Sequence, residues 1–119
     1  MIDWNSDPEL RALRDEFVAS FVERTRLLEA VMSRLRPLGS SPVALGEGLA
    51  DGLHVIAHNL AGAAPTYGFE RLGEIASRID DLLSGEARSL PAAQLLEEAS
   101  RLKMELTSCV GSPACGAKS

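Results

Sequence analysis

Aromatic residues are scarce in this chain of 119 residues: they make up 4% of it, while alanine and aliphatic side chains supply most of its 45% hydrophobic content. Sheets rely on aromatic and β-branched residues, so this composition favours helices packed by aliphatic side chains. The length suits one domain with a single core and is too short for two ordinary domains. The sequence therefore predicts one all-α domain over residues 1–119, with an ordered core at 7–110 and a flexible tail at 111–119.

The chain also lacks an excess of basic residues over acidic ones. Lys and Arg number 12 against 17 Asp and Glu, which gives a net charge of −5, so no basic stripe is available to bind nucleic acid. No apolar run approaches the roughly 20 residues that cross a bilayer. Residues 1–5 do not begin a signal peptide, which would join a basic segment to an apolar one. We therefore expect a cytoplasmic protein that binds neither nucleic acid nor membrane.

Cysteine is limited to Cys109 and Cys115. Two cysteines so close together near the carboxyl end provide neither a disulfide framework nor a four-ligand zinc site. Cys109 falls on the apolar stripe of a predicted helix and is expected to be buried, whereas Cys115 is expected to be exposed in the tail. We expect no metal or cofactor that belongs to the chain itself.

Four segments show apolar residues at helical spacing, separated by short stretches that contain proline or glycine. Short links between helices predict an up-and-down antiparallel four-helix bundle. A short extra helix at the amino terminus is left open, as is a bend or division of the first segment at Arg24 and Thr25, where its apolar stripe is interrupted. No strand is expected. Pro42 is expected to begin the second helix or a turn leading into it, and the last helix to begin near Ser89–Pro91.

The second segment presents a histidine to solvent. At about 100° per residue, Leu53, Ile56 and Leu60 share a narrow apolar stripe, and His58 lies about 180° from its centre. Pro65 should end or kink this helix, because it cannot donate to the carbonyl of Ala61. The outward side near His58 also contains small or polar residues: Asp51, His54, Ala61, Gly62 and Pro65.

Residues 58–69, His-Asn-Leu-Ala-Gly-Ala-Ala-Pro-Thr-Tyr-Gly-Phe, followed by Leu72, resemble the phosphoacceptor segment of histidine-containing phosphotransfer (HPt) domains. That segment has His, any residue, Leu, often Lys, Gly and two small residues, then Gly with an apolar residue several positions on. The resemblance implies that His58 is the phosphoacceptor. One departure is Ala61, which stands where the family often has the lysine that helps to hold the phosphoryl group.

The resemblance also implies surroundings for His58. HPt domains often place a Glu or Gln of the following helix against the imidazole, and Asp80 occupies that position, although a solvated charge is the alternative. The predicted environment of the imidazole and phosphate consists of Asn59, Ala61, Gly62, Asp80 and Arg78. The predicted docking residues are His54, Gly62, Pro65, Gly68 and Arg71. Arg71 and Arg78 could offset the missing lysine, and a turn alone would also explain Gly68.

A neutral imidazole is a good nucleophile towards a phosphoryl group. The chain has no phosphate-cradling loop, lysine clamp or carboxylate cluster for Mg²⁺, so it is expected to be a carrier and not an enzyme. The resemblance implies a two-component phosphorelay protein, and we expect it to be a monomer. Its partners are a sensor histidine kinase and response-regulator receiver domains, whose aspartate and Mg²⁺ supply the catalytic parts.

Three other interpretations remain open. The first is a non-phosphorylated adaptor that docks on a receiver or kinase domain, which Ala61 would permit. The second is a plain helical dimerisation module. The third is a metal pair of His54 and His58, one turn apart, with Asp51 as a weak third ligand.

Overall fold

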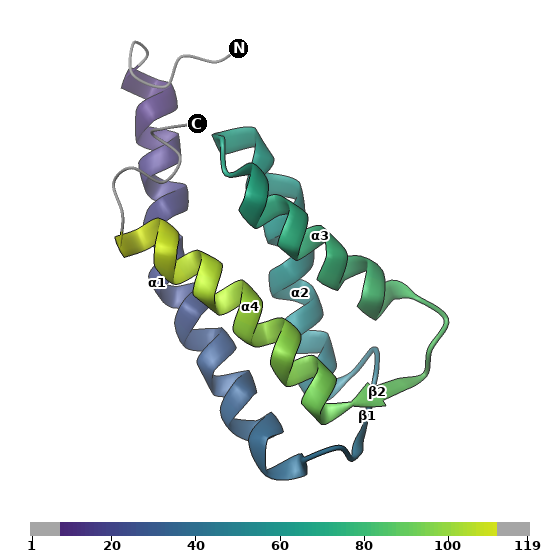
Figure 1. The fold of residues 1–119 in the computed structure, drawn as a ribbon. Helices are drawn as coiled ribbons and strands as arrows, with labels where there is room; N and C mark the ends of the chain where they lie inside the picture. Colours follow the sequence, from purple (N-terminus) through teal and green to yellow (C-terminus); the bar gives the residue numbers. More distant parts are fainter. Residues whose placement is uncertain (1–7, 112–119) are drawn as a thin grey trace.

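The computed structural model describes residues 8–111, and most of these lie in four helices (Figure 1). The helices are α1 (Pro8–Leu35), α2 (Gly48–Ala63), α3 (Glu70–Ser84) and α4 (Ala92–Gly111). Each helix runs antiparallel to the next, with α2 packed along α3 and α1 along α4. The predicted all-α antiparallel bundle is confirmed. Within residues 8–111, no helix combines the length and the apolar character that a membrane crossing requires.

The first helix is continuous for 28 residues, so Arg24 and Thr25 do not divide it. An extra amino-terminal helix would fall in residues 1–7, outside the described residues. Leu13, in the amino-terminal part of α1, is exposed, because α1 extends past the end of α4 there (Figure 1) and has fewer neighbours.

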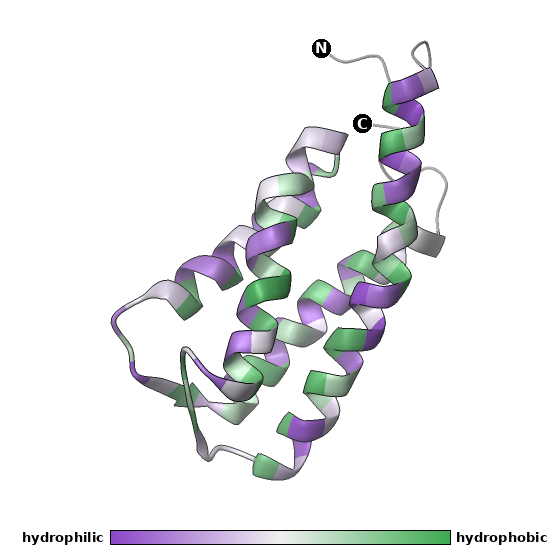
Figure 2. Ribbon diagram, turned by 180° about the vertical axis from the view of Figure 1, so that it is seen from behind, coloured by the Kyte–Doolittle hydropathy of each residue, from purple (hydrophilic) through white to green (hydrophobic). Residues whose placement is uncertain are grey.

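All four helices contribute apolar side chains to one core, and hydrophobic and hydrophilic residues alternate along each helix (Figure 2). The centre of the bundle is packed by leucine, isoleucine and phenylalanine: Phe21, Leu28, Leu35, Leu53, Leu60, Leu72, Ile79, Leu95, Leu102 and Leu106 are fully buried. Cys109 is buried, as predicted. Cys115 and the predicted tail after Gly111 lie outside the described residues.

Two short strands correct the expectation that the chain contains none. Strand β1 (Pro42–Ala44) pairs antiparallel with β2 (Ser89–Pro91) and brings Val43 opposite Leu90. Pro42 therefore begins a strand and not a helix, and α4 begins after Pro91. Both central side chains are half-buried against the core. This pairing closes the end of the bundle where the α1–α2 and α3–α4 links meet (Figure 1).

The link between α2 and α3 is a tight turn, η2 (Pro65–Tyr67). Pro65 was expected to end or kink α2, with a kink near Ala61–Pro65 favoured, but α2 ends at Ala63 and does not continue past a kink. Gly68 follows with φ of +91°, a conformation that favours glycine, and its N–H donates to the carbonyl of Pro65 over 3.1 Å. The turn reverses the chain within a few residues, so α3 runs back along α2.

Aromatic side chains fix this turn against α1. Phe17 stacks on Tyr67 with ring centroids 4.8 Å apart, and Phe21 meets Phe69 edge-on at 5.4 Å. Arg14 lies over the Phe69 ring and donates from Nε to the carbonyl of Tyr67 over 3.2 Å. The aromatic residues of the described part of the chain are therefore concentrated where the histidine-bearing helix ends.

The turn also depends on a close approach between Pro65 and α3. Gly73 is buried, and a Cβ atom added to it would lie 2.6 Å from Cγ and 2.8 Å from Cδ of Pro65. A rigid pyrrolidine ring cannot rotate out of the way. Only glycine at position 73 allows α3 to pack so closely on η2.

We predict that Gly73→Ala destabilises the domain by about 1–3 kcal/mol, because the added methyl forces η2 away from α3. Gly62→Ala is the matched control. Its Cβ would meet nothing within 4 Å, and replacing a helical glycine should stabilise α2 by about 0.5–1 kcal/mol. Urea unfolding followed by circular dichroism measures both. Equal stabilities for the two variants would contradict the proposed packing constraint.

Candidate functional site

His58 projects from α2 at the side where α3 packs alongside it. Its side chain is 71% exposed, as the helical stripe predicted. Nδ1 of His58 lies 3.2 Å from Oδ2 of Asp80, which projects from α3. The antiparallel packing of α2 and α3 therefore joins residues that are 22 positions apart, in the contact that the HPt resemblance implied.

The same carboxylate meets a second imidazole. Oδ1 of Asp80 lies 2.7 Å from Nε2 of His54, one turn before His58 on α2. The Asp80 side chain is only 21% exposed and that of His54 28%. Burial acts to raise the pKa of the Asp80 carboxyl, but the hydrogen bonds from His58 and His54 outweigh it and hold the pKa below its ordinary value. Asp80 is therefore ionised near neutral pH and accepts hydrogen bonds from both rings.

An ionised carboxylate can only accept, so the hydrogen of a neutral His58 ring lies on Nδ1. Nε2 then carries a lone pair, on a side chain that is largely exposed. This arrangement leaves one ring nitrogen available to an electrophile from outside while the other is held by the protein.

The side chains around His58 line a shallow depression of about 400 Å³. Its lining consists of His54, Val55, His58, Asn59, Asp80 and Ser84. Val55 and Ser84 were not identified from the sequence. Ser84 lies one helical turn after Asp80, so helical spacing from that residue is the signal that could have found it.

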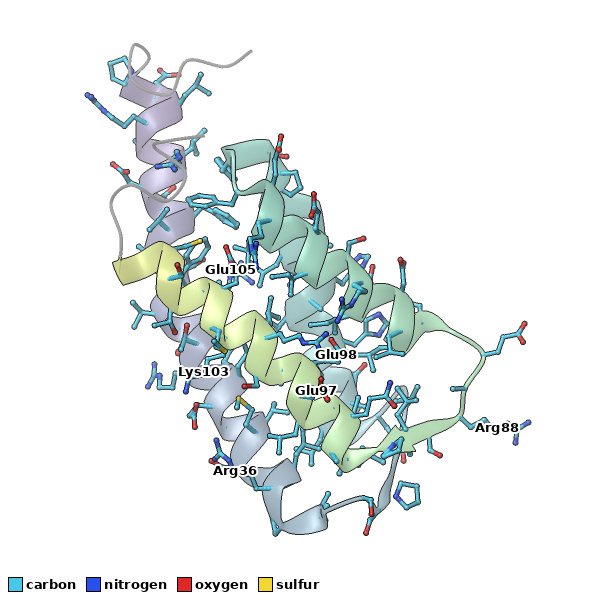
Figure 3. The ribbon with its side chains drawn as sticks, viewed as in Figure 1. Arg36, Arg88, Glu97, Glu98, Lys103 and Glu105 are labelled. Carbon is cyan, nitrogen blue, oxygen red and sulfur yellow. The ribbon has the colours of Figure 1, made fainter. Side chains whose placement is uncertain are left out.

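The two predicted arginines lie apart from this group. Arg71 Nε contacts Glu105 over 3.2 Å, and Arg78 Nη2 contacts Glu98 over 3.2 Å. Both glutamates belong to α4 and lie on its side towards α3 (Figure 3). In this structure the arginines therefore join α3 to α4 and do not line the depression around His58.

The remaining predicted site residues follow His58 along α2 and into the turn after it. Gly62 and Pro65 are exposed beyond His58, and Gly68 is half-buried in the turn after η2. Ala61 was expected to face outward, but it is half-buried and packs against the core. The side chains that line the depression, all within the described part of the chain, include no lysine or arginine.

The described residues provide no third ligand for a metal site at His54 and His58. In the part of the chain that the structure describes, no group of three His, Cys, Asp or Glu side chains is arranged to hold a metal ion. Asp51, the candidate third ligand, is exposed.

Comparison of the chain with known families gives a match over most of its length. A family model described as the Hpt domain matches residues 12–110, which is most of the chain. The chain belongs to the Hpt domain family. Hpt domains take part in histidine phosphotransfer in phosphorelays, as transfer modules that interact with receiver domains and kinases. Searches of curated proteins and of solved structures each gave no match to this Hpt domain.

The lowered pKa of Asp80 predicts a pH-dependent contribution to stability. A carboxyl whose pKa is lower when folded stabilises the protein fully above its unfolded pKa, about 3.9 for Asp, and loses that effect as the pH falls through the folded value. We therefore expect Asp80→Asn to be less stable than the wild type at pH 6, with a difference that shrinks between pH 5 and pH 2.

Urea unfolding across that range measures this difference. Asp81→Asn removes the neighbouring exposed carboxylate and serves as the control, which should show a smaller pH dependence. A difference between Asp80→Asn and the wild type that stays constant down to pH 2 would contradict the interpretation of Asp80.

Proposed function

We propose that this Hpt domain carries a phosphoryl group on Nε2 of His58, between receiver-domain aspartates or from a sensor histidine kinase. The observation that carries the proposal is the combination of a 71% exposed ring with an Nδ1 held 3.2 Å from Asp80 Oδ2. This combination orients one nitrogen as a nucleophile without shielding it from a large partner.

The proposed transfer step needs no general base from this chain. The lone pair of His58 Nε2 attacks phosphorus, and the N–P bond forms as the P–O bond of the donor aspartyl phosphate breaks. The electrons of that bond leave with the donor carboxylate. The His58 ring keeps its hydrogen on Nδ1 and gains positive charge, so its hydrogen bond to Asp80 becomes charge-assisted and stronger. The reverse steps deliver the phosphoryl group to the next receiver aspartate.

The partner supplies what the depression lacks. A phosphoryl group in transfer needs positive charge around its oxygens. We propose that the receiver domain brings Mg²⁺ and its own reactive aspartate, and that this domain brings the histidine alone. The small exposed residues beyond His58, Gly62 and Pro65, leave room for that approach, with His54 and Gly68 at the edges of the docking surface. We further propose that the domain works as a cytoplasmic monomer without catalytic activity of its own.

The decisive test follows transfer of labelled phosphate from a panel of phosphorylated receiver domains and hybrid kinases. We expect the wild type to take up label that is acid-labile and base-stable, and His58→Gln to take up none, because the amide cannot replace the imidazole nucleophile. Circular dichroism and receiver binding of His58→Gln provide the control for folding.

Other outcomes would point elsewhere. Receiver binding with no label on the wild type, across a broad panel, would favour the non-phosphorylated adaptor. Label that persists in His58→Gln would move the acceptor to His54. A dimer in sedimentation, with neither label nor receiver binding, would favour the dimerisation module.

Position 61 allows a test of the missing lysine. Lysine at this position would lie three residues after His58, on a neighbouring part of the helix surface, with its stem along the core and its ammonium group in water. We expect Ala61→Lys to lengthen the half-life of the phosphorylated domain by roughly two- to fivefold, the effect of one solvent-exposed ion pair. Ala61→Met provides an uncharged side chain of similar length, and equal half-lives for the two variants would contradict the prediction.

A further inference from the structure

The shorter of the two hydrogen bonds to Asp80 comes from His54, the ring that does not react in the proposed transfer. Nε2 of His54 lies 2.7 Å from Asp80 Oδ1, whereas His58 Nδ1 lies 3.2 Å from Oδ2. His54 is also the less exposed ring. Asp80 is therefore held chiefly by a residue to which the transfer chemistry gives no part.

Ser84 also contacts Nε2 of His54, the nitrogen whose hydrogen Asp80 already accepts. The hydroxyl of Ser84 donates to the backbone carbonyl of Asp80 over 2.5 Å, and its oxygen lies 3.1 Å from His54 Nε2. With its own hydrogen engaged, the hydroxyl can only accept from His54. Nε2 of His54 therefore carries the hydrogen and shares it between Asp80 and Ser84.

This arrangement excludes a hydrolytic triad. In a Ser-His-Asp triad the serine and the carboxylate bind opposite nitrogens of the ring, so that a proton can move from one side to the other. Here Ser84 and Asp80 both meet Nε2 of His54. Ser84 is not activated as a nucleophile, and the contacts serve to hold Asp80.

We propose that His54 and Ser84 are positioning residues, which fix the Asp80 carboxylate so that His58 keeps its hydrogen on Nδ1 and its lone pair on Nε2. The effect of these residues on transfer rests on the proposed function. Their effect on the hydrogen position of the His58 ring is independent of the proposed function, because it concerns the free domain without a partner.

The physical reason is the rotation of a carboxylate. Asp80 is bound at one oxygen by His54, which leaves the other oxygen directed at His58 Nδ1. Without that anchor, the carboxylate of a surface helix turns into water, where its hydrogen bonds are as good. The free histidine ring prefers its hydrogen on Nε2 in water, so an unheld Asp80 lets His58 return to the form that has no lone pair there.

The test measures the hydrogen position directly, by ¹⁵N spectra of the histidine ring in the free domain at pH 8. The chain has two histidines, so every His54 variant leaves His58 as the single ring observed. We expect the Nδ1–H form in the wild type, a shift towards Nε2–H in His54→Ala, and its recovery in His54→Gln, whose amide can donate to Asp80 without titrating.

Phosphotransfer rates give the second measurement. We expect His54→Ala to slow transfer onto His58 by about 3- to 30-fold, the effect of one hydrogen bond, and His54→Gln to restore most of the loss. Ser84 is exposed, so Ser84→Ala leaves the core intact and should give a smaller change in the same direction, even if His54→Ala does not fold. Ser77→Ala, at another exposed serine of α3, is the matched control and should change neither measurement.

A double-mutant cycle shows whether His54 acts through Asp80. In an Asp80→Asn background, His54→Ala should cause no further change in the ring or in the rate. An unchanged Nδ1–H form in both His54→Ala and Ser84→Ala would overturn the inference, as would rate losses for His54→Ala and Asp80→Asn that multiply. If the wild type takes no label at all, the proposed function fails, and the spectra still decide whether His54 and Ser84 position the ring.

Discussion

The close packing of η2 on α3 determines how α2 and α3 pass each other, and the site depends on that register. The Pro65 ring occupies the space that a side chain on residue 73 would need. Because residue 73 is glycine, η2 and α3 can pack this closely. A helix has a rise of about 1.5 Å per residue, so a slip of one residue would already move Asp80 away from hydrogen-bonding distance of His58. The aromatic cluster around Phe17 and Tyr67 holds the same turn against α1, so the core and the site share one anchor.

Sequence reasoning found the features that depend on the residue pattern of one helix alone. The exposure of His58 follows from its angle to Leu53, Ile56 and Leu60, and the end of α2 follows from the missing N–H of Pro65. The contact of Asp80 with His58 came from the family resemblance and not from spacing. No helical period predicts a contact between two helices, because it depends on how each helix is rotated about its axis.

The features that sequence reasoning missed depend on how the helices pack against one another. His54 was placed at the edge of a docking surface, but its tight contact with Asp80 spans 26 positions and needs the packed structure to be seen. Strands β1 and β2 have three residues each, too few to show an alternating pattern, and they exist because Val43 and Leu90 meet over the core. Arg71 and Arg78 were expected to offset the missing lysine, whereas glutamates of α4 bind both.

The openness of His58 has a consequence for the duration of a signal. A nitrogen that a large partner can reach is equally open to water and to any phosphatase, so nothing steric would protect a phosphoryl group held there. With no cation beside it in the depression, the lifetime of the N–P bond would be set by the chemistry of the bond and by the abundance of acceptors. On the proposed function, the domain would therefore pass a signal on without storing it, and the level of phosphorylation downstream would follow changes at the kinase with little delay.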